Sequence, residues 1–543
     1  MDKKTILAIV LSVLVVLIYQ IFFMKPPAKT PPAAQTATRQ ETPAAGKTTG
    51  AAPAAVTAAP NATATQATAS LQPASAPEKD VRVVTPLYTA VFSTRGAALK
   101  SLKLKGYRET IKQDSDLIEL VDVKTGMPRP LTMTFPESDL NVPAESPFEA
   151  NAASLDLTTV RESRSLTFSV TYPGEIRIDK TFTFHPEKYV IDLEVKATNL
   201  SGRPLTQNGS LNWTQYVDPK TETDSYTHVG PITMADKSVE LQELKKLDTT
   251  RLLGPNIAWT GFESKYFIAA MIPQNPSLSA VSLSKDGRDM TTVSLRGPKN
   301  LIPPGQAGYF IYNVFLGPKD HELLKAQGVG LEDSVDFGSW LKWLAMPLLW
   351  VLKFIYKYLP NYGIAIIVLT LIIKLIFWPL GNISYRSMKE MQKLQPKMKE
   401  IQEKFKNDRQ RLSQETMALY KAHKINPMSG CLPMLIQIPV FFGLYKALMY
   451  AIELRHSPLI WWIQDLSAKD PYYITPVIMG ATMWLQQKMT PSTGDAMQQK
   501  IMLWMPVIFT FLFLNFPSGL VIYWLFNNIF SIGQQYYINK KVA

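Results

Sequence analysis

The run QKIMLWMPVIFTFLFLNFPSGLVIYW, residues 499–524, decides the fold of the C-terminal part of this chain. Apolar side chains fill residues 501–516, and a second apolar segment follows the turn-forming residues Pro517, Ser518 and Gly519. The first segment is somewhat shorter than the roughly 20 residues expected of a membrane helix. Such a short helix thins the bilayer around it. The pattern therefore predicts two antiparallel membrane helices joined by a tight turn.

Further apolar segments lie upstream of this pair. We predict five membrane-spanning helices in the C-terminal part of the chain, at residues 362–380, 431–450, 472–487, 501–516 and 519–537. A sixth apolar segment, Ile6–Phe23, is long enough to cross the hydrocarbon core. Bulky residues follow it where a signal-peptide cleavage site needs small ones. Residues 1–24 are therefore predicted to be an uncleaved anchor.

The distribution of basic residues predicts the orientation of these helices. The loop 381–427 carries eleven Lys and Arg residues, whereas the loop 451–471 carries two. The positive-inside rule places the first loop in the cytoplasm, and six spans then place both termini there. A net charge of +13 is also typical of nucleic-acid binding. The placement of the charges favours a membrane protein of the inner membrane, and no DNA partner is predicted.

The N-terminal half has a different composition. Residues 25–80 are rich in Ala, Pro and Thr and predict a disordered linker. Residues 81–334 show alternating apolar and polar residues, as in Leu166–Tyr172, where a Pro173-Gly174 turn follows. This pattern predicts a large antiparallel β-sandwich. Because the domain follows the N-terminal anchor, we expect it outside the cytoplasm.

No catalytic, metal or cofactor site is predicted. The chain has one cysteine, Cys431, so an intramolecular disulfide is excluded. His185, His228 and His321 lie far apart in the sequence of the β-domain and are expected to be ordinary histidines. We find no nucleotide-binding motif, so the chain is not expected to be an enzyme.

Two amphipathic segments flank the first span of the C-terminal group. Within residues 335–360, Lys342, Lys353 and Lys357 fall in an arc of about 60° on a helix, which predicts a helix on the membrane surface. Residues 384–424 predict a cytoplasmic two-helix hairpin that Pro396 should kink. This basic hairpin binds ribosomal RNA or anionic lipid head groups in one interpretation, and is a solvated loop in the other.

Polar residues inside the predicted spans indicate a function. Lys374 lies within residues 362–380, and an ionised group there is costly and is often functional. Thr370 lies one helical turn away. The last span carries a polar stripe, formed by Tyr523, Asn527, Ser531 and Gln534, and Gln437 and Gln486 add amides from two further spans. Together these residues predict a hydrated, positively charged cavity. Alternatively, the lysine reaches the cytoplasmic interface and the amides join helices.

Four segments of the C-terminal part resemble the YidC/Oxa/Alb family of membrane protein insertases, in its Gram-negative form. They are LQPKMKEIQEKF (394–405), RLSQETMALYKAHKINPMSGCLPMLIQIPVFFGLY (411–445), DLSAKDPYYITPVIMG (465–480) and the run 499–524. The resemblance implies a polytopic α-helical membrane protein with a five-helix core over 361–543 and a periplasmic β-supersandwich related to sugar mutarotases. It also implies a hydrophilic groove open to cytoplasm and lipid. Nascent membrane proteins and the Sec translocon are the implied partners, besides membrane lipids and the ribosome.

The resemblance also assigns roles to residues. Lys374 lies where the family usually has an arginine, which keeps the charge but loses the planar five-donor fork. Trp524 lies where the family has a substrate-contacting tyrosine, next to Tyr523. The groove-lining residues are then Thr370, Gln437, Tyr523, Trp524, Asn527 and Ser531. The apolar surface for substrate is expected at Met434, Phe441, Met505 and Phe509.

Two other functions are compatible with parts of the sequence. A secondary transporter or channel for small solutes would also need polar residues within its spans, but such proteins usually show repeated span architecture. No such repeat is visible. A carbohydrate-active enzyme held on an anchor would leave the five C-terminal spans unexplained. The insertase is therefore the function that we expect.

Overall fold

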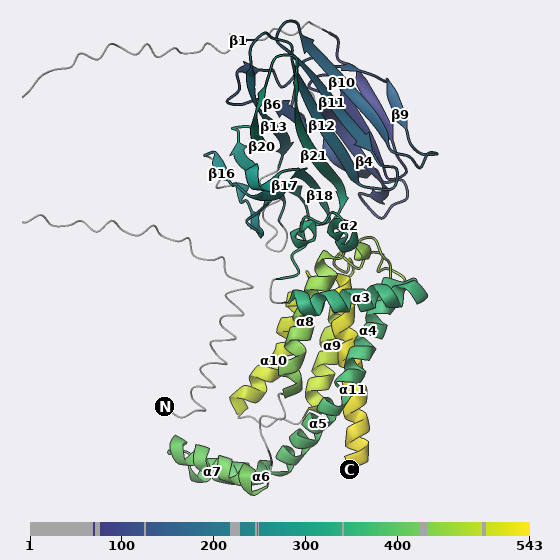
Figure 1. Ribbon diagram of the computed structural model, residues 1–543. Coiled ribbons are helices and arrows are strands. Elements are labelled where there is room, and N and C mark those ends of the chain that lie inside the picture. The colour runs from purple at the N-terminus through teal and green to yellow at the C-terminus, as the bar shows by residue number, and fades with distance from the viewer. Residues whose placement is uncertain are drawn as a thin grey trace, which may run out of the picture. The chain divides into compact units, whose positions relative to one another are not determined.

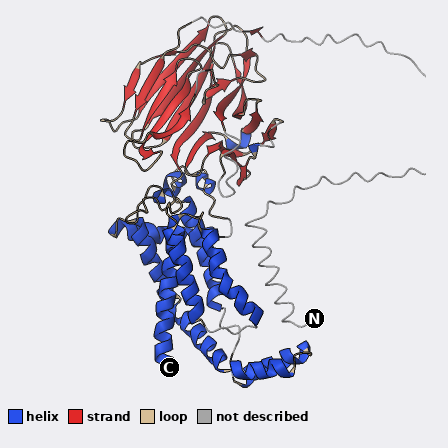
Figure 2. Ribbon diagram, turned by 180° about the vertical axis from the view of Figure 1, so that it is seen from behind, coloured by secondary structure: helices blue, strands red, loops and turns tan. Residues whose placement is uncertain are grey.

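The computed structural model describes residues 69–70, 76–123, 126–217, 228–244, 247, 249–338, 341–423, 425, 432–490 and 496–542. The predicted anchor over residues 1–24 and most of the predicted linker lie outside these residues. Among the described residues, strands form the part up to Pro318, and helices form most of the rest (Figures 1 and 2).

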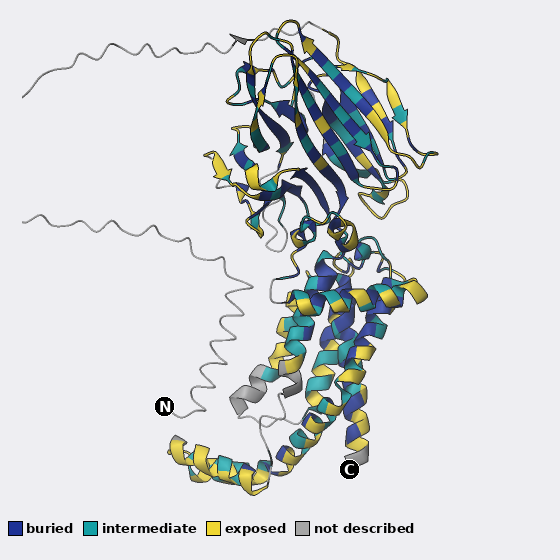
Figure 3. Cartoon of the chain, viewed as in Figure 1, coloured by how far each residue is buried: buried dark blue, intermediate teal, exposed yellow. Residues whose placement is uncertain are grey.

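The strands arise where apolar and polar residues alternate. In β10 (Arg164–Tyr172) and β11 (Ile176–Phe184), every second residue is buried, and the two strands form an antiparallel hairpin. The connecting turn is closed by a hydrogen bond from the Glu175 amide to the Tyr172 carbonyl oxygen at 3.0 Å. Gly174 in this turn has a φ of 74°, which glycine adopts without strain. The pattern of burial along these strands is visible in Figure 3.

The described strands form three larger sheets and one short pair. The nine-stranded sheet has the order β15 (Ser238–Leu241), β14 (Gly230–Ala235), β17 (Ile257–Glu263), β18 (Phe267–Pro273), β21 (Ala307–Pro318), β12 (Val190–Asn199), β11, β10, β8 (Glu149–Ala150). One five-stranded sheet has the order β16 (Arg251–Leu253), β19 (Ala280–Lys285), β20 (Met290–Ile302), β13 (Leu205–Tyr216), β6 (Thr132–Thr134). The other has the order β5 (Leu117–Asp122), β4 (Ala98–Arg108), β3 (Tyr88–Ser93), β2 (Asp80–Val84), β9 (Ser154–Asp156).

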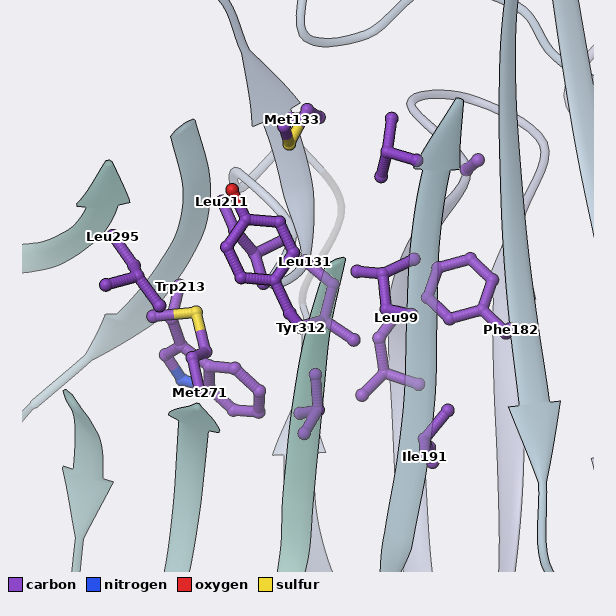
Figure 4. Packing of buried hydrophobic residues seen from close by; sticks show 14 of the residues in the cluster. Leu99, Leu131, Met133, Phe182, Ile191, Leu211, Trp213, Met271, Leu295 and Tyr312 are labelled. Atoms are coloured by element: carbon purple, nitrogen blue, oxygen red, sulfur yellow. The ribbon is translucent and has the colours of Figure 1, made fainter. Parts of the chain in front are cut away.

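The core of the β-domain lies between these sheets. Trp213 of β13, Phe182 of β11 and Leu99 of β4 come from three different sheets, and all three are fully buried in one apolar cluster (Figure 4). Burial of an aromatic or aliphatic side chain of this size contributes about 1.5–3 kcal/mol. The predicted sandwich architecture is therefore present. All pairings are antiparallel except β2 with β9 and β1 with β7.

One strand was not expected. Strand β1 (Ala69–Ser70) lies within the predicted disordered linker and pairs in parallel with β7 (Leu140–Asn141). The composition of the linker argues against a packed core, but a strand pairing needs only main-chain hydrogen bonds. Ordered main chain was therefore not predicted at these two residues, and the extent of the linker stays a prediction.

The described helices follow the β-domain in the order α2 (His321–Lys325), α3 (Lys342–Tyr358), α4 (Tyr362–Ile376), α5 (Trp378–Lys393), α6 (Gln395–Lys404), α7 (Arg409–Ala422), α8 (Leu432–Tyr450), α9 (Ile474–Met489), α10 (Ala496–Phe513) and α11 (Ser518–Val542). Three 3-10 helices also occur among the described residues, at Pro276–Leu278, Leu331–Ser334 and Ile452–Leu454. Helices α4 and α8 to α11 lie within a few residues of the five predicted spans.

The predicted span 362–380 is interrupted. Helix α4 ends at Ile376, and α5 begins at Trp378 with a bend of 63° between them. Pro379 lies in the first turn of α5, where a proline is tolerated because its missing N–H would have no helical partner. Within the described residues, no single helix meets the length and hydropathy needed for a membrane span, but the pair α4 and α5 meets them together.

The predicted hairpin contains three helices rather than two. The chain breaks at Leu394, between α5 and α6, two residues before Pro396. A short turn connects α6 to α7. The Asp408 carboxylate caps the first turn of α7 by accepting a hydrogen bond from the Arg411 amide at 3.0 Å. The proline therefore starts a new helix instead of kinking a continuous one.

Candidate functional site

Lys374 lies in the last turn of α4 and points toward α11. Its Nζ donates a hydrogen bond to Ser531 Oγ at 2.6 Å, and Ser531 Oγ donates to the Asn527 carbonyl oxygen at 2.7 Å. The lysine side chain is partly buried, not extended into bulk solvent. Helices α4, α8, α9, α10 and α11 contain no Asp or Glu. None of these helices therefore supplies a carboxylate to neutralise this lysine.

Further polar contacts join α11 to its neighbours next to Lys374. Gln437 of α8 donates from Nε2 to Asn527 Oδ1 at 2.7 Å. The side chain of Tyr385 in α5 hydrogen-bonds with Ser531 and with Gln486 of α9. The polar groups that the sequence predicted on separate spans therefore meet around α11. We call Lys374, Gln437, Asn527 and Ser531 the polar row.

Gln534 extends this contact toward the start of α5. Its Nε2 donates to the Trp378 carbonyl oxygen and to Asn382 Oδ1, both at 3.0 Å. A Cβ atom at Gly381 would lie 2.7 Å from Gln534 Nε2, so a side chain at this position would displace the Gln534 amide. Asn382 was not predicted, because a single amide after Pro379 does not form a repeat of polar residues at helical spacing.

A second polar face of α11 was missed in the sequence. Gln535 donates from Nε2 to the Met489 carbonyl oxygen at 2.6 Å, and Asn528 donates to the Met479 carbonyl oxygen at 3.4 Å. Both accepting residues lie in α9. The signal was present, since two amides seven residues apart occupy the same face of a helix. This face joins α11 to α9 rather than lining the polar row.

Two residues predicted to line a groove are buried in the helix packing. Thr370 is 1% exposed, and its hydroxyl donates to the Ile366 carbonyl oxygen of its own helix at 2.7 Å. Tyr523 is also 1% exposed, and its ring stacks on Phe441 with centroids 6.4 Å apart. The proposed contacts of Thr370 and Tyr523 with substrate stay predictions. In the structure both side chains contact neighbouring helix residues, Ile366 and Phe441 respectively.

Trp524 forms the centre of an aromatic cluster. Its ring lies 4.7 Å from Phe441 of α8, edge to face, 5.9 Å from Phe509 and 5.2 Å from Phe513, both of α10. Phe441 and Phe509, two of the four residues predicted to contact substrate, therefore contact Trp524, which was predicted to line the groove. Met505 is 38% exposed on α10. Met434 belongs to α8, but its side chain lies outside the described residues.

The matches to known families cover the chain in two adjacent segments. Residues 80–351 match the model described as "YidC periplasmic domain", and residues 354–543 match "60Kd inner membrane protein". The chain is 64% identical to a protein of Syntrophus aciditrophicus named "Membrane protein insertase YidC", with all of both chains covered. A protein of the same name from Geobacter metallireducens is 43% identical, covering 100% of this chain and 99% of that one.

Two solved structures are also similar in part. A crystal structure of an active YidC insertase is 20% identical, with a TM-score of 0.37, and covers 87% of this chain and 95% of that chain. A galactose mutarotase-like protein from Lactobacillus casei is 11% identical, with a TM-score of 0.31, and covers 44% of this chain and 99% of that chain.

A β-sandwich followed by a helical part is the arrangement that the two matching models describe, a periplasmic domain and an inner membrane protein. The sequence matches then specify the family. The chain belongs to the YidC family of membrane protein insertases.

Proposed function

We propose that this chain moves hydrophobic segments of newly made membrane proteins into the bilayer, and that the polar row receives the polar part of each substrate. Membership of the insertase family supports the activity. The contact between Lys374 and Ser531 supports the location, because it holds a cation among helices without acidic residues. An uncompensated positive charge attracts the acidic residues that flank many hydrophobic segments.

The substrate itself supplies the free energy for this process. Each Leu, Ile, Val or Phe contributes about 0.3–0.6 kcal/mol on entering the bilayer, so an apolar segment of roughly 20 residues partitions into lipid without ATP. The protein only has to lower the barrier for the polar flank. This part of the proposal implies a role in insertion and folding without a catalysed covalent reaction.

We place six spans in the membrane, with both termini in the cytoplasm. The spans are the N-terminal apolar segment, α4 with the start of α5, and helices α8, α9, α10 and α11. Helices α6 and α7, which carry six of the eleven basic residues of the loop 381–427, then face the cytoplasm, where ribosomal RNA or anionic lipid head groups are available. The exposed apolar residues of α10, such as Trp504 and Phe511, then face lipid or substrate. A complex with the Sec translocon is part of this proposal.

The first prediction concerns the charge of Lys374. In cells depleted of the native insertase, Lys374→Glu is expected to lower insertion of a client with an acidic translocated tail by about tenfold or more, which corresponds to ~1.4 kcal/mol. Lys374→Arg should retain activity, because the positive charge persists. Protease protection of the client tail measures insertion.

The matched control is Lys188→Glu at an exposed position of the β-domain, which changes the net charge equally. We expect the control to insert the client normally. Equal insertion by Lys374→Glu and wild type would rule out attraction of the substrate by this charge.

A further inference from the structure

Basic side chains of the helical part contact the β-domain and the segment through which the chain leaves it. Lys342 of α3 pairs with Asp333, and Lys446 of α8 pairs with Asp336 at 2.6 Å. Arg455, which follows α8, donates from Nη2 to the Arg108 carbonyl oxygen at 2.6 Å. In all three contacts the helical part supplies the positively charged group.

Lys353 makes the most connected of these contacts. From the middle of α3 its Nζ binds Asp320 Oδ2 at 3.2 Å, and it also pairs with the Glu453 carboxylate. Asp320 caps the N-terminus of α2 by accepting hydrogen bonds from the amides of Glu322 and Leu323. Glu453 lies in the 3-10 helix Ile452–Leu454 directly after α8. One ammonium therefore joins three separate elements.

All three charges of this junction are partly withdrawn from water. The side chains of Lys353, Asp320 and Glu453 are 29%, 22% and 15% exposed. Burial opposes the charge on Lys353, but Glu453 and Asp320 outweigh it and raise the pKa of Lys353. Burial likewise opposes ionisation of Asp320, and Lys353 with the α2 amides holds its pKa below the usual value. Without the lysine, two carboxylates would face each other in a poorly solvated place.

A stripe of α3 next to Lys353 is exposed. Trp343, Trp350 and Phe354 are 69%, 66% and 49% exposed along one stripe of the helix. Such rings favour an interfacial lipid layer. The inward face packs through Leu349 and Leu352, which belong to a buried apolar cluster shared with α4 and α8. Lys353 lies on the flank between these two faces, and its ion pairs add directional contacts there.

We infer that Lys353 is a positioning residue that fixes the rotation of α3, and thereby the placement of α8, for membrane insertion. Leu344 of α3 lies against Gly443 of α8, two residues from Phe441 and six residues from Gln437. A rotated α3 would shift this contact and with it the helix that carries part of the polar row. The inference rests on the proposed insertase function.

A disulfide between α3 and α8 reports this rotation directly. A Cβ atom at Gly443 would lie 3.5 Å from Leu344 Cβ, which is within the range for a disulfide. The test uses the full chain in membranes, with Cys431→Ser and the pair Leu344→Cys and Gly443→Cys. We expect efficient oxidation of this pair, a fall of at least threefold with Lys353→Met, and recovery with Lys353→Arg. Lys357→Met, on the same helix and exposed, is the matched control and should change nothing.

Insertion of a client by the same variants without the introduced cysteines gives the second readout. Lys353→Met should lower insertion at least threefold, and Lys353→Arg should restore it. If wild type does not insert the client, the proposed function fails. If wild type inserts it and Lys353→Met changes neither insertion nor the disulfide yield, the positioning role is wrong.

A variant with a milder change keeps the test decisive if Lys353→Met does not accumulate. Glu453→Gln leaves the lysine paired with Asp320, so its disulfide yield should lie between wild type and Lys353→Met. A yield equal to wild type in Glu453→Gln membranes would overturn the inference.

Discussion

Lys180 of β11 shows how one charged residue can be essential to the β-domain. Its side chain is fully buried, and its Nζ donates to the carbonyl oxygens of Gly96, Ala97 and Leu131 at 3.0, 2.7 and 2.8 Å. All three accepting residues have left-handed backbone, with φ of 75°, 45° and 62°. An ammonium has three donors, so it satisfies the three oxygens at once.

Replacing this lysine should therefore destabilise the β-domain. Lys180→Met keeps most of the side-chain volume but leaves three buried carbonyl oxygens without a donor, which is expected to cost about 2–4 kcal/mol. Hydrogen exchange of the β11 amides in the full chain measures the loss. Lys188→Met, at an exposed position after the same strand, should leave exchange unchanged. Unchanged protection of β11 in Lys180→Met would contradict the role of the three contacts.

The same residue predicts a pH dependence of stability. Burial lowers the pKa of Lys180 to about 7 in the folded chain, whereas an unfolded lysine titrates near ~10.4. Between these values the unfolded chain binds more protons, so the free energy of unfolding should rise with pH from about 7 to ~10.4. Below pH 7 both states are protonated and this contribution is constant. Exchange of the β11 amides at pH 7.5 and 9 measures the slope, after correction for intrinsic rates. Equal slopes for wild type and Lys180→Met would contradict this prediction.

Helical spacing predicted some residues of the polar row better than others. A spacing of four placed Asn527 and Ser531 on one face, and the structure brings both to the side of α11 that meets α4 and α8. Spacing could not predict that Thr370 donates to its own helix, because a hydroxyl chooses between local and distant acceptors only after packing. The substrate roles of these residues stay predictions.

At the scale of elements, the break between α4 and α5 was not visible in the apolar pattern. Residues 362–380 are apolar almost throughout, so hydropathy indicates one span. Pro379 was the local signal, since a proline cannot donate to the preceding turn and ends the helix before it. The strands were easier to predict, because one buried face produces a period of two over many residues.

The packing of α9 against α10 depends on Gly480. A Cβ atom at this position would overlap Thr510 Oγ1, whose hydroxyl donates to the Pro506 carbonyl oxygen at 2.7 Å. Gly480→Leu is therefore expected to separate the two helices and to lower stability by about 1–3 kcal/mol. Thermal unfolding in detergent, followed by size-exclusion chromatography, measures the change. Gly533→Leu is the control, because a Cβ there meets no described atom within 4 Å. Equal midpoints for the two variants would contradict the close contact.

At the scale of the whole molecule, the sequence predicted the two parts of the described chain but not their internal order. Alternating residues over 81–334 predicted a sandwich, yet the order of the nine-stranded sheet joins β18 to β21 and β21 to β12 across long sequence distances. Such pairings depend on contacts that no local pattern encodes. The six membrane spans stay a prediction based on hydropathy and charge.

The final prediction concerns the route of the substrate through the molecule. A photo-crosslinking residue at Phe441 or Met505 is expected to capture a stalled nascent membrane protein, because these positions lie on α8 and α10 beside the aromatic cluster of Trp524. The same probe at Leu252, which is 68% exposed on the β-domain, is the control and should capture much less. Equal capture at all three positions would contradict a route along α8 and α10.

The ion pairs of α3 affect how its lysines should be counted when the positive-inside rule is used to assign the sides of the membrane. Lys342 and Lys353 are paired with Asp333, Asp320 and Glu453, which leaves the exposed Lys357 as the lysine of this helix for which the described residues show no ion pair. A tally of cations that counts all three would bias the segment toward the cytosol. Discounting paired lysines removes most of that bias, and a hydropathy-based assignment of similar amphipathic helices gains from the same correction.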